Sequence, residues 1–573
     1  MSQDSATENL ESTNQQTSPE EKEKPASVAR SASIVSIAVM GSRVMGLIRE
    51  MVFARYFGAG FLMDAYFVGF RIPNTLRDLF AEGALSAAFV KTFTDYQVNK
   101  SEQEAWRLAS MVLNALAIVL SIITILGVLL APYIIGLLDY SPEKARLATT
   151  LTQIMFPFIL MVALAAVAMG VLNTKGRFGI PASASTAFNI VSIIAGLIFA
   201  FWLSGGSWSN TAKDVVPDSA AQWAIIGMAI GTLLGGAAQF LIQVPSLFKV
   251  GFRFSPIVSF TDPGVRQVMR LMGPAIIGTS AVQVKVLVDT FIVSGIDGGQ
   301  SWLSYAFRLM QFPIGVFGVA IGTAAIPTLS RFAAKGDTTN FRSTLSNSLG
   351  LVFLMTIPCA CGLIVLGDPI IRLIYERGVY TSFDTEMAAW ALTAYSIGLS
   401  GYAAIKVLSP SFYALDDAKT PMYVSVASIL VHAVTSYSMM KLFSTIGVTP
   451  ARPNGFGHVG VALATSAVAL VNFFALAIFM RRRIHRIEGR KILSSFIRIC
   501  IASVALSAAS YFTYKLLFNA LGSNGIILRL IEAFVPIAIG GTAFLVLAKL
   551  LKIQELDQFV NAIAGRFLRR KTA

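Results

Sequence analysis

Charged side chains interrupt the first two hydrophobic segments of this chain, where a membrane-spanning helix should have none. The charges of the two segments are Arg43, Arg49, Glu50, Arg55, Asp64, Arg71, Arg77, Asp78, Glu82 and Lys91. One charge at the centre of a spanning helix costs roughly 2.5–3.5 kcal/mol on the insertion scale. Five or six of them facing lipid would cost on the order of 15–20 kcal/mol, so they must face a polar interior. We therefore expect a protein that binds or moves something hydrophilic or anionic inside the membrane.

Arginine is in excess within this set. On an ideal helix, Asp64, Arg71, Asp78 and Glu82 fall within about 40° of one another and form one polar stripe, whereas Arg77 points elsewhere. Opposite charges could simply neutralise each other as buried pairs. However, the arginines, with Arg308 of a later segment included, outnumber the carboxylates. A guanidinium donates two parallel hydrogen bonds to phosphate oxygens, so the excess favours a site for a phosphate-like anion.

A second, smaller group of polar residues lies later in the chain. Lys285 and Asp289 are four residues apart, so they could form a self-neutralising pair on one helix. His432 is more typical of a hydrogen-bonded core residue. The alternative interpretation is a site for a coupling cation or a proton. The sequence contains no GxxxxGK[ST] phosphate loop, so we do not expect this chain to hydrolyse ATP.

The composition is that of a helical membrane protein. Of the 573 residues, 55% are hydrophobic and only 13% are charged, against about 25% charged in a soluble protein. Apolar runs of about 20 residues recur along the chain, which predicts an all-α polytopic protein. The net charge of +15 would suggest nucleic acid as the partner of a soluble protein. Here it fits the positive-inside rule, and no nucleic-acid partner is expected.

We count fourteen hydrophobic segments, and the loops between them alternate in charge. One side carries most of the Lys and Arg residues, including the cluster Arg481–Arg483, while the other side is nearly devoid of them. The basic side is expected to be cytoplasmic, which places both termini in the cytoplasm. The three cysteines, Cys359, Cys361 and Cys500, lie in or beside apolar runs and show neither a metal-site spacing nor a disulfide framework.

A weak internal repeat with an offset of 237 residues relates the two halves of the chain. Phe70-Arg71 matches Phe307-Arg308, and Phe80 matches Phe317. Chance similarity between apolar helices is the alternative. The repeat predicts two six-helix lobes related by an axis along the membrane normal, with the site between them. The expected units are a disordered acidic tail (1–28), a first lobe (29–250), a second lobe (251–485), two extra spans (486–552) and a basic cytoplasmic tail (553–573).

Two blocks of sequence are similar to a known family. They read SRVMGLIREMVFARYFGAGFLMDAYFVGFRIPNTLRDLFAEGALSAAFVKTF at 42–93 and YAFRLMQFPIGVFGVAIGTAAIPTLS at 305–330. Together with the KTP at 419–421, they resemble the MurJ (MviN) family of bacterial lipid II flippases, in the multidrug/oligosaccharidyl-lipid/polysaccharide exporter superfamily. The resemblance implies two lobes plus two extra helices around a cationic central cavity. It also implies export of undecaprenyl-diphosphate-linked peptidoglycan precursor to the outer leaflet of the bacterial inner membrane by alternating access.

The resemblance also implies roles for particular residues. The family's essential cavity arginines correspond to Arg43, Arg49, Arg77 and Arg308, and their acidic partners to Asp64 and Glu82. The last two spans would form a groove for the polyprenyl tail. Some members bind sodium between spans 7, 11 and 12. Asp289 and Thr465 fit that pattern, whereas His432 and Ser436 replace amide or carboxylate groups. The implied partners are lipid II, membrane lipids and cell-wall synthesis proteins, with no cofactor beyond a monovalent cation or the membrane potential.

Two other functions compete with this one. An exporter of another polyprenyl-diphosphate-linked glycan, or a multidrug exporter of the same superfamily, would share the fold. Drug exporters have twelve spans, and an arginine-rich cavity disfavours cationic drugs. A membrane-embedded glycan polymerase should carry a catalytic carboxylate in a sizeable external loop, and none stands out.

Overall fold

The computed structural model describes residues 25–79, 85–206, 218–486, 488–522 and 525–569. Within these ranges the regular secondary structure is helical, apart from one β-bridge between Thr449 and Arg452. The predicted N-terminal tail lies almost wholly outside the described residues, and the first helix begins at Pro25. An all-α fold is therefore confirmed for the described chain.

Where it is described, the first half of the chain forms nine helices. They are α1 (Pro25–Phe57), α2 (Phe61–Arg77), α3 (Ser86–Asn99), α4 (Glu102–Ile135), α5 (Pro142–Met155), α6 (Phe158–Thr174), α7 (Gly179–Leu203), α8 (Ser219–Leu241) and α9 (Val244–Lys249).

The second half continues with α10 (Pro263–Val293), α11 (Gly299–Pro313), a π-helical turn (Ile314–Gly318), α12 (Val319–Ala334), α13 (Thr338–Tyr375), α14 (Ser382–Ile397), α15 (Leu399–Ala414), α16 (Lys419–Phe443) and α17 (Gly457–Arg483). Three more helices follow: α18 (Gly489–Leu521), α19 (Ile526–Leu550) and α20 (Gln554–Arg569). The last of these occupies most of the segment that we expected to be a basic tail.

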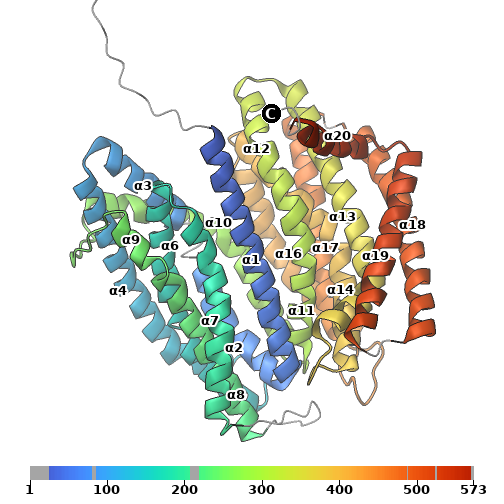
Figure 1. The fold of residues 1–573 in the computed structure, drawn as a ribbon, viewed down its shortest axis with the longest axis horizontal. Coiled ribbons are helices and arrows are strands. Elements are labelled where there is room, and N and C mark those ends of the chain that lie inside the picture. The colour runs from blue at the N-terminus through green and yellow to red at the C-terminus, as the bar shows by residue number, and fades with distance from the viewer. Residues whose placement is uncertain (1–24, 80–84, 207–217, 487, 523–524, 570–573) are drawn as a thin grey trace, which may run out of the picture.

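The helices pack as two lobes with an added pair (Figure 1). Helices α2 and α4–α8 pack against one another in the first lobe, and α11–α17 do so in the second. The pair α18 and α19 packs on α13 at the far edge of the second lobe. Contacts between the lobes come chiefly from α10 and α11, which meet α2, α3 and α4. These contacts bring the charged segment of α2 against the second lobe.

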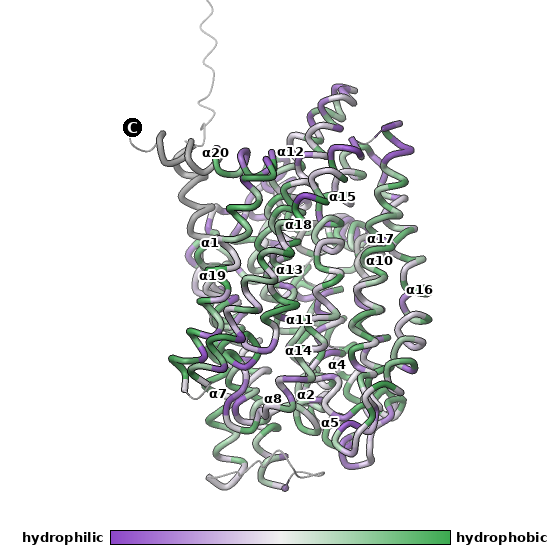
Figure 2. The backbone as a smooth tube through the Cα atoms, turned by 90° about the vertical axis from the view of Figure 1, so that its right-hand side faces the viewer, coloured by the Kyte–Doolittle hydropathy of each residue, from purple (hydrophilic) through white to green (hydrophobic). Residues whose placement is uncertain are grey.

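Ten helical segments of the described chain are long and apolar enough to cross a membrane, or up to eleven if the bent pair α14 and α15 is one span. Hydrophobic residues run along most helices, with hydrophilic ones concentrated toward the ends (Figure 2). The predicted spans 30–57, 62–94 and 266–295 fall outside this count, although they are helical where described. These three segments carry most of the intramembrane charges, and the charges lower their mean hydropathy. The total of fourteen spans stays a prediction.

Small residues set the closest packing between helices. A Cβ atom added at Gly231 of α8 would lie 2.3 Å from the Cα of Gly196 in α7. Such contact between two backbones is possible only with glycine on at least one side, as in other membrane-helix pairs. Polar side chains define several helix starts. For example, Ser101 and Asp262 accept hydrogen bonds from backbone amides in the first turns of α4 and α10.

One backbone feature recurs at the offset of 237 residues. The π-helical turn that interrupts the second-lobe span begins at Ile314, and π-helical backbone also occurs at Asp78 and Leu79 in the first lobe. Position 78 plus 237 is position 315, so the two turns lie at equivalent places. A π-turn inserts an extra residue into an α-helix and often occurs at functional sites. Both turns follow directly after the arginine-bearing helices α2 and α11.

Candidate functional site

An ion pair joins the two lobes in the C-terminal third of α1. Glu50, which is buried, accepts hydrogen bonds from Nε of Arg308 at 2.6 Å and from the hydroxyl of Tyr375 at 3.3 Å. Arg308 lies on α11, and half of its side-chain surface is exposed. Arg308 is therefore held by a carboxylate on one side and remains accessible on the other.

No ion pair with a carboxylate is found among the described residues for Arg43, Arg49 or Arg71 of α1 and α2. Arg49 lies over the ring of Phe188 at 5.1 Å, and its Nη1 is buried without a hydrogen-bond acceptor. Arg71 reaches only the hydroxyl of Ser304 at 3.5 Å, and its Nε is also buried without an acceptor. Arg43 is exposed. A buried donor that lacks an acceptor costs about 1–3 kcal/mol, and more when it is charged, so these groups indicate a site shaped for an anion.

The guanidinium of Arg43 lies against the second lobe. A Cβ atom added at Gly315, in the π-helical turn, would lie 2.5 Å from its Nη1. The absence of a side chain at Gly315 therefore leaves room for Arg43 beside the π-helical turn. This contact places Arg43, like Arg308, at the junction of α1 with the second lobe.

Arg77 is paired with the residue that follows it. Its Nη2 donates to Oδ1 of Asp78 at 2.6 Å, and Oδ2 of Asp78 accepts from Nε2 of Gln283 in α10 at 3.0 Å. The helix position alone had directed Arg77 away from the stripe, yet its guanidinium reaches the stripe residue Asp78. Glu82, which the resemblance assigned as an acidic partner, lies outside the described residues.

Asp64 lies at the opposite end of α2, in a buried contact between the lobes. It is 1% exposed, and its carboxylate accepts bonds from the backbone amides of Gly298 (2.8 Å) and Ser301 (2.9 Å) and from the Ser301 hydroxyl (2.6 Å). Asp64 thus caps the first turn of α11 from the other lobe, where the helix dipole favours a negative charge.

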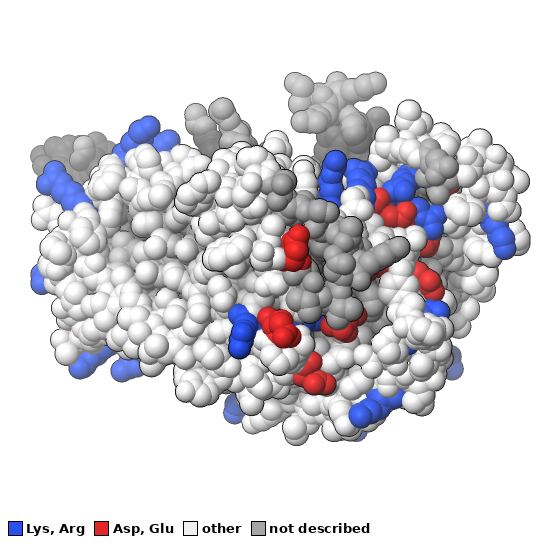
Figure 3. Space-filling model, turned by 90° about the horizontal axis from the view of Figure 1, so that it is seen from below, with Lys and Arg blue, Asp and Glu red and all other residues white. Residues whose placement is uncertain are grey.

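Lys144 completes this contact. It is 2% exposed, and its Nζ lies 2.8 Å from Oδ2 of Asp64 and 2.9 Å from Oδ1 of Asp297. We call the set of Asp64, Lys144, Asp297, Gly298 and Ser301 the clasp. It joins α2 and α5 to the start of α11. Acidic side chains gather near the middle of the molecular face at this end, with basic ones mostly toward the rim (Figure 3).

Asp289 does not pair with Lys285. Its Oδ1 lies 2.8 Å from Nε2 of His432 and accepts a hydrogen bond from the hydroxyl of Ser436 at 3.0 Å, while Oδ2 accepts from Thr465 at 3.5 Å. The structure therefore brings together the four residues that the family resemblance singled out on spans 7, 11 and 12.

This donor set does not fit a dedicated sodium site. A hard cation prefers several oxygen ligands, but here an imidazole nitrogen occupies one of the two carboxylate oxygens. The hydroxyls of Ser436 and Thr465 also donate to the carboxylate and take up part of its acceptor capacity.

Comparison with known proteins identifies the family. The model of the family "Lipid II flippase MurJ" matches residues 53–531. The chain is 34% identical over 459 residues to the probable lipid II flippase MurJ of Vibrio cholerae serotype O1, covering 78% of this chain and 82% of that protein. It is also 34% identical over 463 residues to lipid II flippase MurJ of Burkholderia cenocepacia, covering 79% and 84%. The chain belongs to the MurJ family.

Solved structures agree with this assignment. A lipid II flippase MurJ in an inward closed conformation superposes with a TM-score of 0.69 at 28% identity, covering 90% of this chain and 98% of that chain. A multidrug-resistance MATE transporter in an inward-facing conformation gives a TM-score of 0.61 at 14% identity, covering 79% and 94%. The second match shows the fold alone, and both agree with an all-α polytopic fold for this MurJ family member.

Reasoning from the sequence missed two features of the site. Lys144 lies in the first turn of α5, so in the sequence it resembles an ordinary interfacial lysine, and only its position in space reveals its two partners. Arg71 was recognised as part of the stripe but was not assigned to the binding set. The signal that would have included it is its match with Arg308 at the offset of 237 residues.

Proposed function

We propose that this protein is a transporter that moves lipid II, the undecaprenyl-diphosphate-linked peptidoglycan precursor, from the cytoplasmic to the outer leaflet by alternating access. Membership of the MurJ family supports the substrate class. The structural observation that carries the proposal is the pair of buried guanidinium donors, on Arg49 and Arg71, that have no acceptor. A diphosphate supplies acceptor oxygens of the right charge.

The arginines have distinct roles in this proposal. Arg49 and Arg71 bind the diphosphate directly, with Arg43 at the accessible edge of the site. Arg308 exchanges its bond with Glu50 for a bond with the diphosphate, since half of its side chain is already accessible. Arg77, which is held by Asp78, contributes when that pair opens. The exchange at Arg308 links binding of the anion to the contact between α1 and α11, and hence to the relative position of the lobes.

The clasp supplies the closed state at one end of the pathway. In the proposed orientation, with both termini in the cytoplasm of a bacterial inner membrane, the clasp lies at the outer end. Opening toward the outer leaflet requires Asp64 to leave the first turn of α11. The site is then inaccessible from outside while the clasp is formed, as alternating access requires.

We propose that the membrane potential, rather than sodium, drives the cycle. The Asp289 carboxylate is already occupied by His432, Ser436 and Thr465, and the unpaired arginines together with an anionic headgroup form a movable charge. Moving one elementary charge across 100 mV is worth about 2.3 kcal/mol, a bias of nearly fifty-fold. The remaining partners that we propose are membrane lipids and the enzymes that polymerise lipid II outside.

Reconstitution tests the substrate and the anion site together. The assay follows lipid II with a fluorescent headgroup in proteoliposomes by its protection from a membrane-impermeant quencher. Each lost charge-assisted hydrogen bond is worth about 1.5–3 kcal/mol, so Arg49→Ala and Arg71→Ala should each slow flipping at least about tenfold. Arg146→Ala, at an exposed arginine of α5, is the matched control. Normal flipping by both site variants would refute the anion site.

The same liposomes separate the competing functions. Movement of a cationic drug or of another diphosphate-linked glycan, without movement of lipid II, would replace the proposal with the corresponding exporter. Imposed potassium, sodium and proton gradients, varied one at a time, test the coupling. An electrical gradient alone should change the rate, and a sodium gradient without a potential should not.

A further inference from the structure

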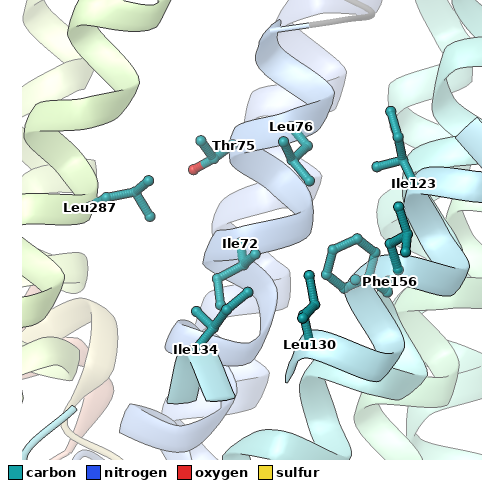
Figure 4. Close-up of a pocket in the computed structure, with 10 residues that line it drawn as sticks. Ile72, Thr75, Leu76, Ile123, Leu130, Ile134, Phe156 and Leu287 are labelled. Carbon is teal, nitrogen blue, oxygen red and sulfur yellow. The ribbon is translucent and has the colours of Figure 1, made fainter. Parts of the chain in front are cut away.

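An apolar cavity of about 300 Å³ lies between α2, α4 and α10 (Figure 4). Side chains from both lobes line it. Ile72 comes from α2, Ile123, Leu130 and Ile134 from α4, Phe156 from the junction of α5 and α6, and Leu287 from α10 of the second lobe. Apart from Thr75, the lining side chains carry no polar atom, so the cavity suits a hydrocarbon ligand.

The cavity is continuous with the lipid-facing surface of the protein. Leu126 and Leu130, which line it, are 51% and 48% exposed. They belong to a strip on α4 in which Ile122, Ile125 and Leu129 are more exposed still. In a spanning helix this strip faces the hydrocarbon of the bilayer. A chain from the membrane can therefore enter the cavity sideways without crossing any polar region.

The length of the cavity corresponds to one leaflet. Ile123 and Ile134, the limits of its lining on α4, are eleven residues apart, which is about 16 Å along a helix. Half of a hydrocarbon core of about 30 Å is about 15 Å. With α4 ending at Ile135 on the side that the proposed function places outside, the cavity runs from the bilayer centre into the outer leaflet.

A glycine keeps the cavity wall in its present shape. A Cβ atom added at Gly127 would lie 1.9 Å from Cζ of Phe156. The Phe156 ring thus lies directly against the α4 backbone instead of being displaced into the cavity. Since Leu287 comes from the other lobe, anything bound here touches both lobes, and its contacts must change when the lobes move.

We propose that this cavity binds one acyl chain of an outer-leaflet phospholipid, which contacts both lobes. The proposal uses only the membrane orientation given under the proposed function. A polyprenyl tail is a poorer match, because it exceeds the length of one leaflet and because the α18–α19 pair, where such a tail would bind, lies at the opposite edge of the molecule from α4 (Figure 1). A protein partner is disfavoured by the opening of the cavity onto hydrocarbon.

Photolabelling of the full chain in liposomes tests this site. The probe is a phosphatidylglycerol carrying a diazirine midway along one acyl chain, and mass spectrometry maps the adducts. Ile123→Trp fills the cavity from α4, and Leu287→Trp fills it independently from α10. Ile122→Trp places the same side chain on the exposed face of α4 and serves as the matched control.

Adducts should concentrate on the cavity-lining parts of α2, α4 and α10 in the unmodified protein. Both filling variants should lower that labelling at least about tenfold, since each excluded CH₂ group is worth a factor of roughly four, while Ile122→Trp should not. Equal labelling in all variants, or preferential labelling of the cavity by a photoreactive polyprenyl diphosphate, would overturn the proposal. Photolabelling measures phospholipid binding without transport. A negative labelling result therefore leaves the flippase proposal unaffected, and a negative flipping result leaves the phospholipid site unaffected.

Discussion

Removing the Lys144 ammonium should open the outer end of the molecule. In Lys144→Met the buried Asp64 carboxylate loses its ion-pair partner but keeps three hydrogen bonds from Gly298 and Ser301. Breaking a buried pair from one side costs about 3–5 kcal/mol. We place this variant at the lower end of that range, because the surviving bonds still solvate the charge. A loss of about 3 kcal/mol shifts the equilibrium between clasped and open conformations by roughly 100-fold toward the open one.

Distance measurements between spin labels can follow this shift. Labels at Leu137, 73% exposed after α4, and at Val448, 55% exposed between α16 and α17, report on the two lobes at the clasp end. Lys144→Met should add or enlarge a population with a longer distance. The control is Glu386→Gln, which removes the surface pair with Arg452 within the second lobe. An exposed pair is worth at most about 1 kcal/mol, so the control distances should match those of the unmodified protein.

A double-mutant cycle sharpens the test. Asp64→Asn removes the charge that Lys144 neutralises, so adding Lys144→Met to it should shift the distance distribution much less than Lys144→Met does alone. If the single Lys144 variant leaves the distribution unchanged, or if the two effects simply add, the clasp does not hold the lobes together and the assignment of a closing role to Asp64 is wrong.

Three further predictions concern other parts of the molecule. Replacing sodium with potassium on both sides of the membrane should leave the flipping rate unchanged, because His432 already occupies the Asp289 carboxylate; a rate that requires sodium would contradict this. Gly231→Ala should lower the melting temperature, since overpacking costs about 1–3 kcal/mol, whereas Gly362→Ala, where the added Cβ meets nothing within 4 Å, should not. The pKa of Asp337, the N-cap of α13, is lowered because its carboxylate accepts hydrogen bonds from the backbone amide and the side chain of Asn340. Its stabilising effect should therefore be present at neutral pH and lost as the pH falls through that lowered value, and melting curves of Asp337→Asn should lack this pH dependence.

The charge pattern predicted the general position of the site but not its pairing. Helical spacing placed Asp64, Arg71 and Asp78 on one face of α2, and each of these residues now contacts α10 or α11 of the second lobe. Spacing could not show that Asp64 would cap a helix 234 residues away, because that depends on how the lobes dock. For the same reason it could not distinguish Lys285 from His432 as the partner of Asp289.

Hydropathy predicted the architecture well but performed worst on the helices that carry the site. It predicted the membrane class and most spans, since apolar runs of helical length have few alternatives in a bilayer. It was weakest for α1, α2 and α10, where charges reduce the apolar signal. These helices also carry most of the arginines of the candidate anion site, as well as Asp289. The helix α20 was missed because a short amphipathic segment beyond the last span does not differ in composition from a basic tail.

The two halves of the site represent opposite uses of buried charge. In the clasp every charge has a partner, so the contact between the lobes is stable and must be broken for the cycle to proceed. At Arg49 and Arg71 buried donors have no acceptor, so this part of the protein is less stable than it would be with a ligand. An anion bound there would accept hydrogen bonds from these donors and so stabilise the protein. Because Arg308 joins the same region to Glu50 on α1, that gain can be transmitted to the lobe contact, and this connection allows a substrate to influence a clasp that it does not touch.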